Sequence, residues 1–80
     1  MGTREIVLDT LVDIIGDEQV RQNLDLRLYD LGLLDSFRTV ELMVALSDRL
    51  GQDISPAEFE REMWATPRAM MDALSQKIDQ

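Results

Sequence analysis

Apolar residues recur at helical spacing in three stretches of this chain, with polar residues between them. The first stretch predicts a helix that begins with Thr3 as its N-cap and ends near Gly16. Asp9 and Asp13 lie on its expected solvent side, where a carboxylate pair four residues apart is a surface feature rather than a site. The expected buried stripe consists of Ile6, Val7, Leu11, Ile14 and Ile15.

The segment from Asp17 to Asp35 breaks this pattern. A short helical turn is expected around residues 18–22, and leucines then recur through the rest of the segment. We interpret it as a long loop that the leucines attach to the core, not as a strand. Loops of this length are uncommon in compact domains and are often functional. The leucines are Leu24, Leu26, Leu28, Leu31 and Leu33.

A second long helix is expected from about Ser36 to Leu50, with Gly51 as its C-cap. The charged residues left for its surface are Arg38, Glu41, Asp48 and Arg49. Its expected buried face consists of Val40, Met43, Val44 and Leu50, broadened by Leu42 and Leu46.

Two more helix starts follow. Ser55 and Glu58 form a capping box around Pro56, which predicts a short helix. Thr66 as N-cap and Pro67 at the first helical position predict a last helix that runs to about Ile78, with Met70, Met71, Leu74 and Ile78 as its apolar residues. The chain is therefore predicted to be all-α, a small bundle of three long helices plus one short helix.

Length and charge narrow the functional classes. Eighty residues predict a single domain, residues 1–80, with no room for a catalytic domain beside it. Sixteen acidic and eight basic residues give a net charge of -8, which argues against nucleic acid and favours partners with basic surfaces. No segment resembles a signal peptide and no apolar run approaches the roughly 20 residues of a membrane-spanning helix, so the expected location is cytoplasmic. We also expect a monomer. The chain has no Cys, and no acidic cluster has calcium-loop spacing, so no metal site is expected.

Ser36 lies at the expected start of the second long helix, with Asp35 at or beside the N-cap. Backbone N–H groups and the positive end of the helix dipole converge there, which favours a phosphate. A nucleophilic serine of the triad type needs a histidine base, and the chain has no His. Ser36 is therefore expected to be modified by another enzyme; the simpler alternative is that it only caps a helix.

This arrangement resembles acyl carrier proteins and peptidyl carrier domains. The resemblance rests on Asp35-Ser36 at the start of a helix, after a leucine-rich loop, in a small acidic helical chain. It implies that Ser36 carries 4′-phosphopantetheine, installed from coenzyme A by a phosphopantetheinyl transferase. It also implies that Asp35 assists this magnesium-dependent transferase, and that the thiol of the arm holds a substrate as a thioester. Such a carrier performs no catalysis itself.

Two blocks are similar to the D-alanyl carrier proteins of teichoic acid D-alanylation. One spans residues 32–37 and continues through 39–42; the other spans 59–64 and is followed by Thr66-Pro67. The resemblance implies that a D-alanine–carrier ligase activates D-alanine as an adenylate and loads the arm on Ser36. A membrane-bound acyltransferase would then pass the D-alanyl group toward teichoic acid. Arg38 departs from the small residue expected beside Phe37, which bears on partner docking more than on the modification.

Partner contacts are expected on the second long helix. Glu41 and Asp48 lie two turns apart on one face and suit basic partner surfaces. Leu34 or Phe37 is expected to be an exposed anchor for a partner. Val40 is expected in the core, and Trp64 is expected to be a packing residue rather than a contact residue.

Two alternatives remain open. The first is an acyl or aminoacyl carrier for fatty-acid, polyketide or nonribosomal peptide synthesis, and the second is an unmodified acidic helical adaptor. A fatty-acid carrier must shelter a long chain between its helices, whereas D-alanine is small and cationic and gains nothing from burial. We therefore expect no deep apolar cavity beside Ser36.

Overall fold

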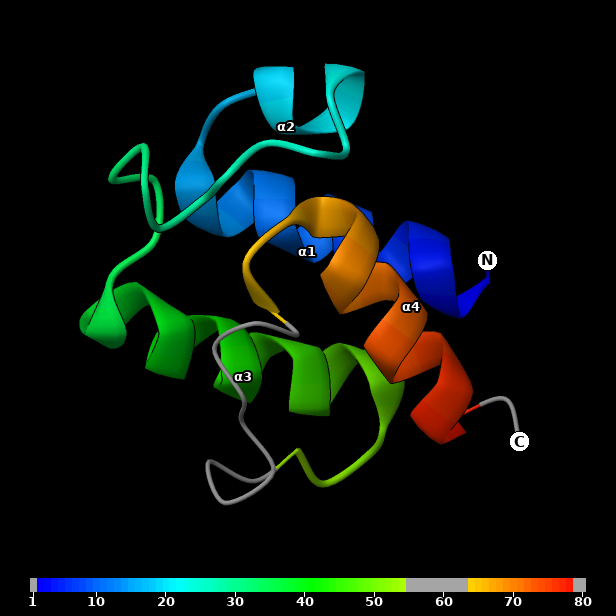
Figure 1. Ribbon diagram of the computed structural model, residues 1–80. Helices are drawn as coiled ribbons and strands as arrows, with labels where there is room; N and C mark the ends of the chain where they lie inside the picture. The colour runs from blue at the N-terminus through cyan, green and yellow to red at the C-terminus, as the bar shows by residue number, and fades with distance from the viewer. Residues whose placement is uncertain (1, 55–63, 79–80) are drawn as a thin grey trace.

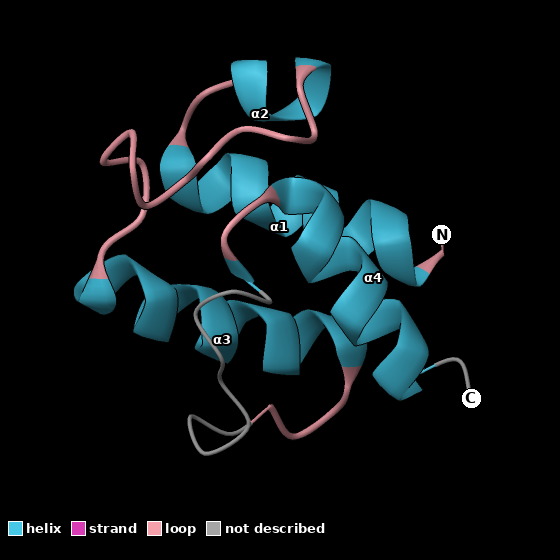
Figure 2. Ribbon diagram, in the orientation of Figure 1, coloured by secondary structure: helices cyan, strands magenta, loops and turns pink. Residues whose placement is uncertain are grey.

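Four helices form the part of the chain that the computed structural model describes, residues 2–54 and 64–78 (Figure 1). They are α1 (Thr3–Ile15), α2 (Gln19–Gln22), α3 (Ser36–Leu50) and α4 (Pro67–Ile78). Loops connect them and no strand occurs in these residues, which confirms the all-α prediction (Figure 2). The main helix–helix contacts are those of α1 with each of the other three. The short helix predicted after Pro56 lies outside the described residues.

Helix α1 begins one residue earlier than predicted. Its N-cap is Gly2, whose carbonyl oxygen accepts the N–H of Ile6 at 3.1 Å, so Thr3 is already helical. The predicted buried stripe is partly wrong: Ile6, Ile14 and Ile15 are only half-buried. The buried residues are Val7, Thr10, Leu11 and Val12. Because α1 contacts three other helices, its buried arc is set by those neighbours more than by its own apolar pattern.

Helix α3 has the predicted limits but not the predicted buried face. Val40 and Val44 are 54% and 63% exposed, so their assignment to the core is wrong. The buried residues are Thr39, Leu42, Met43 and Leu46, while Leu50 is half-buried. Apolar residues occur on both sides of this helix, and the helical period alone cannot tell which side faces the core. The C-cap is Gly51 as predicted, at φ 65°, a left-handed conformation that glycine adopts without strain.

The loop between α2 and α3 is attached to the core, as predicted. Leu28 is fully buried, and Leu24, Leu26 and Leu33 pack against the core. Leu31 is the exception, since it is 56% exposed. Backbone hydrogen bonds join this loop to the segment that enters α4: the N–H of Leu28 donates to Ala65 O, and that of Arg68 donates to Leu24 O, both at 2.9 Å. The loop is therefore part of the folded body.

Trp64 and helix α4 complete the core. Trp64 is 4% exposed, which confirms it as a packing residue. Thr66 caps α4 as predicted, because its Oγ1 accepts the N–H of Ala69 at 3.1 Å. The buried residues of α4 are Pro67, Met70, Met71 and Leu74. None of the described helices is both long and apolar enough to cross a lipid bilayer.

Candidate functional site

Ser36 is the first residue of α3, and its side chain is exposed. Asp35 is the N-cap: its backbone is extended, and its Oδ1 accepts the N–H of Arg38 at 2.8 Å. This confirms the capping role predicted for Asp35. The second carboxylate oxygen, Oδ2, receives no hydrogen bond from any described residue.

The start of α3 presents unpaired N–H donors beside Ser36. Asp35 satisfies the N–H of Arg38, and the N–H of Thr39 makes the first helical hydrogen bond, to Asp35 O at 2.9 Å. The N–H groups of Ser36 and Phe37 have no acceptor within residues 2–54 and 64–78. Two exposed donors at the positive end of a helix favour an anion, so a phosphate attached to Ser36 fits the residues present.

The loop in front of Ser36 is held firmly. Leu28 O accepts two N–H groups, from Leu33 at 2.9 Å and from Leu34 at 3.1 Å. Gly32, at φ 74°, turns the chain between Leu28 and Leu33 and donates its N–H to Tyr29 O at 3.1 Å. Both Leu28 and Leu34 are buried, so the chain is fixed in the core two residues before Ser36. Ser36 is therefore exposed, while the segment just before it is fixed to the core.

Two hydroxyl groups, those of Tyr29 and Thr39, form a chain of hydrogen bonds that ends at Asp35 O, next to Ser36. The Oγ1 of buried Thr39 donates to Asp35 O at 2.7 Å, which uses its single proton. Tyr29 OH lies 2.8 Å from the same Oγ1 and must therefore donate to it. Sequence reasoning missed this contact; the signal that could have shown it is a Thr four residues after the N-cap on the buried side of α3.

An exposed apolar stripe runs along α3 from the residue after Ser36. Phe37 is 73% exposed, and Val40 and Val44 follow at helical spacing. Together with Ile14 of α1 and with Ala45, Glu41 and Asp48, they line an open groove of about 450 Å³. Of the two anchor candidates, only Phe37 is exposed; Leu34 is 2% exposed and belongs to the core. The structure therefore brings Phe37, Glu41 and Asp48 to one surface and leaves Leu34 beneath it.

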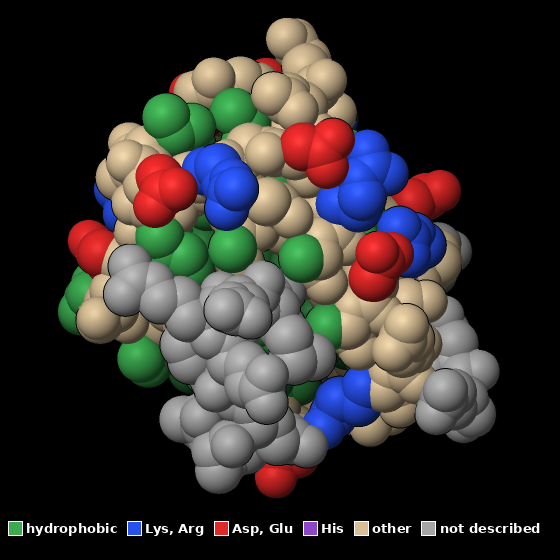
Figure 3. Space-filling model, viewed as in Figure 1, with side chains coloured by type: hydrophobic (Ala, Val, Ile, Leu, Met, Phe, Trp, Pro, Cys, Tyr) green, Lys and Arg blue, Asp and Glu red, His purple; other side chains and the backbone are tan. Residues whose placement is uncertain are grey.

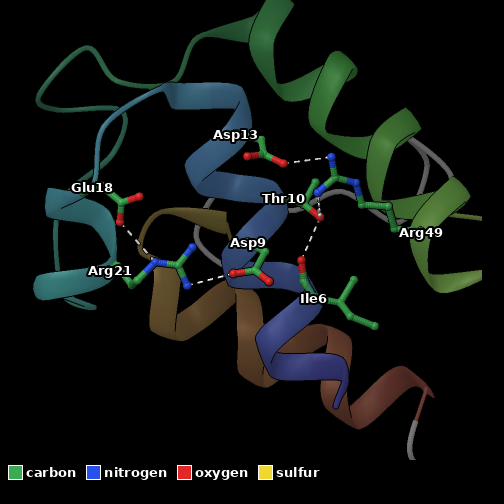
Figure 4. A network of polar contacts seen from close by, with 7 residues as sticks. All are labelled: Ile6, Asp9, Thr10, Asp13, Glu18, Arg21 and Arg49. Carbon is green, nitrogen blue, oxygen red and sulfur yellow. Dashed lines mark hydrogen bonds and ion pairs between the residues drawn. The ribbon is translucent and has the colours of Figure 1, made fainter. Parts of the chain in front are cut away.

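A second hollow, of about 510 Å³, lies over α1 and is lined by ion pairs (Figure 4). Asp9 pairs with Arg21 at 2.8 Å, and Asp13 pairs with Arg49 at 2.9 Å. The hydrogen bonds that the Arg21 guanidinium donates, first to Asp9 and then to Glu18, raise the pKa of Arg21. Elsewhere too, red and blue side chains lie in adjacent groups on the face seen in Figure 3. The Asp9–Arg21 and Asp13–Arg49 pairs join α2 and α3 to α1, so Asp9 and Asp13 have a structural role that the sequence did not indicate.

The site can present a hydroxyl and bind an anion. Within the described ranges, no group of three potential metal ligands comes together. The chain has no His or Cys, so neither side chain is available to activate Ser36. The geometry is compatible with the attachment of a group to this hydroxyl.

Comparison with known proteins gives the class of this acceptor. Residues 5–74 match the family described as "Phosphopantetheine attachment site", so the chain is a carrier of the phosphopantetheine-binding class. It is 43% identical over 70 residues to the D-alanyl carrier protein of Lacticaseibacillus rhamnosus, covering 88% of this chain and 86% of that protein. It is 41% identical over 71 residues to that of Enterococcus faecalis, covering 89% and 91%. For the D-alanyl carrier protein of Bacillus velezensis the values are 38% over 76 residues, covering 95% and 97%. The chain belongs to the D-alanyl carrier protein family.

Proposed function

We propose that Ser36 carries 4′-phosphopantetheine and that the arm holds D-alanine for the D-alanylation of (lipo)teichoic acid. The observation that carries this proposal is the position of Ser36: it is exposed, it is the first residue of α3, and no described residue accepts its own N–H or that of Phe37. Membership of the carrier family supports the kind of group attached. When bound, the arm supplies a thiol that carries the D-alanyl group as a thioester.

The residues around Ser36 have separate tasks in this proposal. Ser36 Oγ would form an O–P bond to the phosphorus of coenzyme A that bears the pantetheine. The P–O bond to adenosine 3′,5′-bisphosphate would break, and the Oγ proton would pass to the transferase. The N–H groups of Ser36 and Phe37 would be available to the resulting phosphodiester, and the helix dipole would stabilise its charge. Asp35 keeps Oδ1 on the Arg38 N–H and leaves Oδ2 available to the magnesium-dependent transferase.

The surface beside the arm suits a small cationic cargo. The groove on α3 is open and is bordered by Glu41 and Asp48. A long acyl chain gains from burial in an enclosed apolar site, whereas the ammonium group of a D-alanyl thioester stays hydrated at low cost. This observation favours the D-alanyl cargo over a fatty acyl cargo.

We propose three partner enzymes that dock on the same surface. A phosphopantetheinyl transferase, a D-alanine–carrier ligase and a membrane-bound acyltransferase must each approach Ser36 in turn. We propose that Phe37 is the exposed anchor for them, while Glu41 and Asp48 steer basic enzyme surfaces toward α3. The ligase uses ATP, which places loading on the cytoplasmic side, and the carrier acts as a monomer.

Intact-mass measurement tests the attachment site. The chain is incubated with coenzyme A and a broad-specificity phosphopantetheinyl transferase, and we expect it to gain the mass of one arm. Ser36→Ala should gain nothing, while the matched control Ser75→Ala should be modified like the wild type. No gain in the wild type refutes the carrier function, and a gain that survives Ser36→Ala places the arm elsewhere.

A loading assay then tests the cargo. The modified chain is incubated with ATP and candidate ligases for D-alanine, L-alanine and fatty acids, and thioester formation is followed by mass. We expect efficient loading by the D-alanine ligase alone. Preferential loading with a fatty acid or an L-amino acid would instead support the other carrier class.

A further inference from the structure

Arg38 is an exposed cation that the described fold does not neutralise. Four arginines each pair with an aspartate from another helix or loop: Arg4 with Asp72, Arg21 with Asp9, Arg49 with Asp13, and Arg68 with Asp25. Arg38 forms no ion pair with any residue in 2–54 or 64–78, and the same holds for Arg27 in the loop. The chain has twice as many acidic as basic residues, so an arginine on α3 that pairs with none of the described carboxylates is unexpected.

Helical geometry places Arg38 at the edge of the exposed stripe. Successive residues turn by about 100°, so Ser36 and Arg38 flank Phe37 on opposite sides at the start of α3. Glu41 follows one turn further along, near Arg38, yet the two do not form an ion pair. The surface that borders the arm is therefore not uniformly acidic: it has a cation beside Phe37 and carboxylates at Glu41 and Asp48.

The helix itself gains nothing from this cation. A positive charge in the first turn meets the positive end of the dipole, which is unfavourable. The backbone N–H of Arg38 is needed by Asp35, but any residue other than proline supplies that donor. Since no described residue pairs with the guanidinium, it is available to a protein that docks on α3.

This inference rests on the proposed function. We propose that the ligase that loads the arm presents a carboxylate to Arg38. This contact fixes the orientation in which the ligase binds α3. A guanidinium binds a carboxylate with two parallel hydrogen bonds, which gives direction as well as energy. Phe37, next to Arg38 and 73% exposed, excludes water from the pair when it enters the partner surface. Basic groups of the ligase then face Glu41 and Asp48.

Reversing the charge of Arg38 distinguishes a ligase surface that has both a carboxylate and basic groups from one that is uniformly basic. The phosphopantetheinylated wild type, Arg38→Gln and Arg38→Glu are loaded by the D-alanine–carrier ligase encoded in the same genome, at low and at high salt. Arg38→Glu should raise the KM for the carrier by about ten- to hundredfold, which is the change expected when a charge-assisted hydrogen bond is lost. The kcat should stay within about twofold of the wild-type value. Arg38→Gln should lie between the two, and high salt should reduce the difference.

A second site provides the control. Lys77→Glu makes the same charge change in the last turn of α4, at the other end of the molecule from the start of α3 (Figure 1). It should leave the KM unchanged. Thermal melting followed by circular dichroism shows whether each variant is folded, and Arg38→Gln keeps the test valid if Arg38→Glu does not fold.

The outcomes separate the two proposals. A KM for Arg38→Glu equal to that of the wild type overturns the inference, and a lower KM overturns it in favour of a uniformly basic partner. Failure of the wild type to accept the arm or D-alanine refutes the proposed function instead. A ligase variant in which an acidic surface residue is changed to Arg should restore loading of Arg38→Glu.

Discussion

Replacing Asp35 by Ala and by Asn separates its capping role from its carboxylate charge. Asp35 Oδ1 accepts the Arg38 N–H at 2.8 Å, and Asp35 also precedes the proposed attachment site. Ala removes the hydrogen bond and the charge together. Asn keeps an oxygen in the same place, so it retains the cap and removes only the charge.

The two substitutions should differ in stability by a measurable amount. A cap of this kind contributes about 1 kcal/mol, and the favourable interaction of an exposed carboxylate with the dipole adds about 0.3–1 kcal/mol. Asp35→Ala should therefore lose about 1–2 kcal/mol, and Asp35→Asn less than about 1 kcal/mol. For a domain of this size, 1 kcal/mol lowers the Tm by about 4–8 °C, so the Ala variant should be easily resolved.

Urea unfolding followed by circular dichroism measures the free energy of unfolding, and intact mass measures the rate of arm attachment. Asp30→Asn makes the same chemical change at an exposed loop position and should behave like the wild type. Because Asp35→Asn keeps the cap, a rate of modification reduced by about tenfold or more would isolate the carboxylate as a recognition element. Equal destabilisation by Ala and Asn would refute the cap argument. Modification of the Asn variant at the wild-type rate would refute the role in recognition.

Three further predictions concern stability. Trp64→Ala should lower the free energy of unfolding, measured in urea, by about 3–5 kcal/mol because the ring is buried. Phe37→Ala, at an exposed position, should change it by no more than about 0.5 kcal/mol. A loss below about 1 kcal/mol for Trp64→Ala would contradict its place in the core. The hydrogen bond from Arg68 lowers the pKa of Asp25, so the unfolded chain binds the proton more readily. The resulting stabilisation should be present above the unfolded pKa of about 3.9 and be lost as the pH falls through the lower folded value. Asp25→Asn should remove this part of the pH dependence of the unfolding free energy, and an unchanged profile would show that the pair contributes nothing. Finally, added NaCl or Mg²⁺ should raise the Tm, since a net charge of -8 is self-repulsive; a lower Tm would mean that the screened Arg–Asp pairs matter more.

Features that depend on a few neighbouring residues were predictable from the sequence. Asp35 and Thr66 cap their helices through N–H groups three residues ahead, and Gly51 ends α3 in the left-handed conformation. Such interactions are complete within one helical turn, so residue type and spacing suffice to predict them. The candidate site shares this property, because Asp35, Ser36 and the N–H groups of Ser36 and Phe37 lie in one turn of α3.

The identity of the buried face was not predictable in the same way. Val40 and Val44 have the spacing of core residues but lie on the exposed stripe. Thr39 is buried instead, and its hydroxyl is hydrogen-bonded to Tyr29 OH and Asp35 O. A period of 3.6 residues defines which side chains share a face, and says nothing about which face another helix covers. Phe37 is exposed for the same reason, whereas Leu34 is buried because the loop before α3 folds back onto Leu28, a contact that the sequence pattern does not show.

Residue type and spacing are enough to predict the class of fold, the ends of α3 and α4, and a serine at a helix start in a chain without a histidine. The tertiary structure decided which apolar residues remain on the surface, how Leu28 and Leu34 hold the loop before Ser36, and which arginines are neutralised. Capping and turn formation depend on atoms a few residues apart. Burial and ion pairing depend on residues far apart in the chain, which only the packed fold brings together.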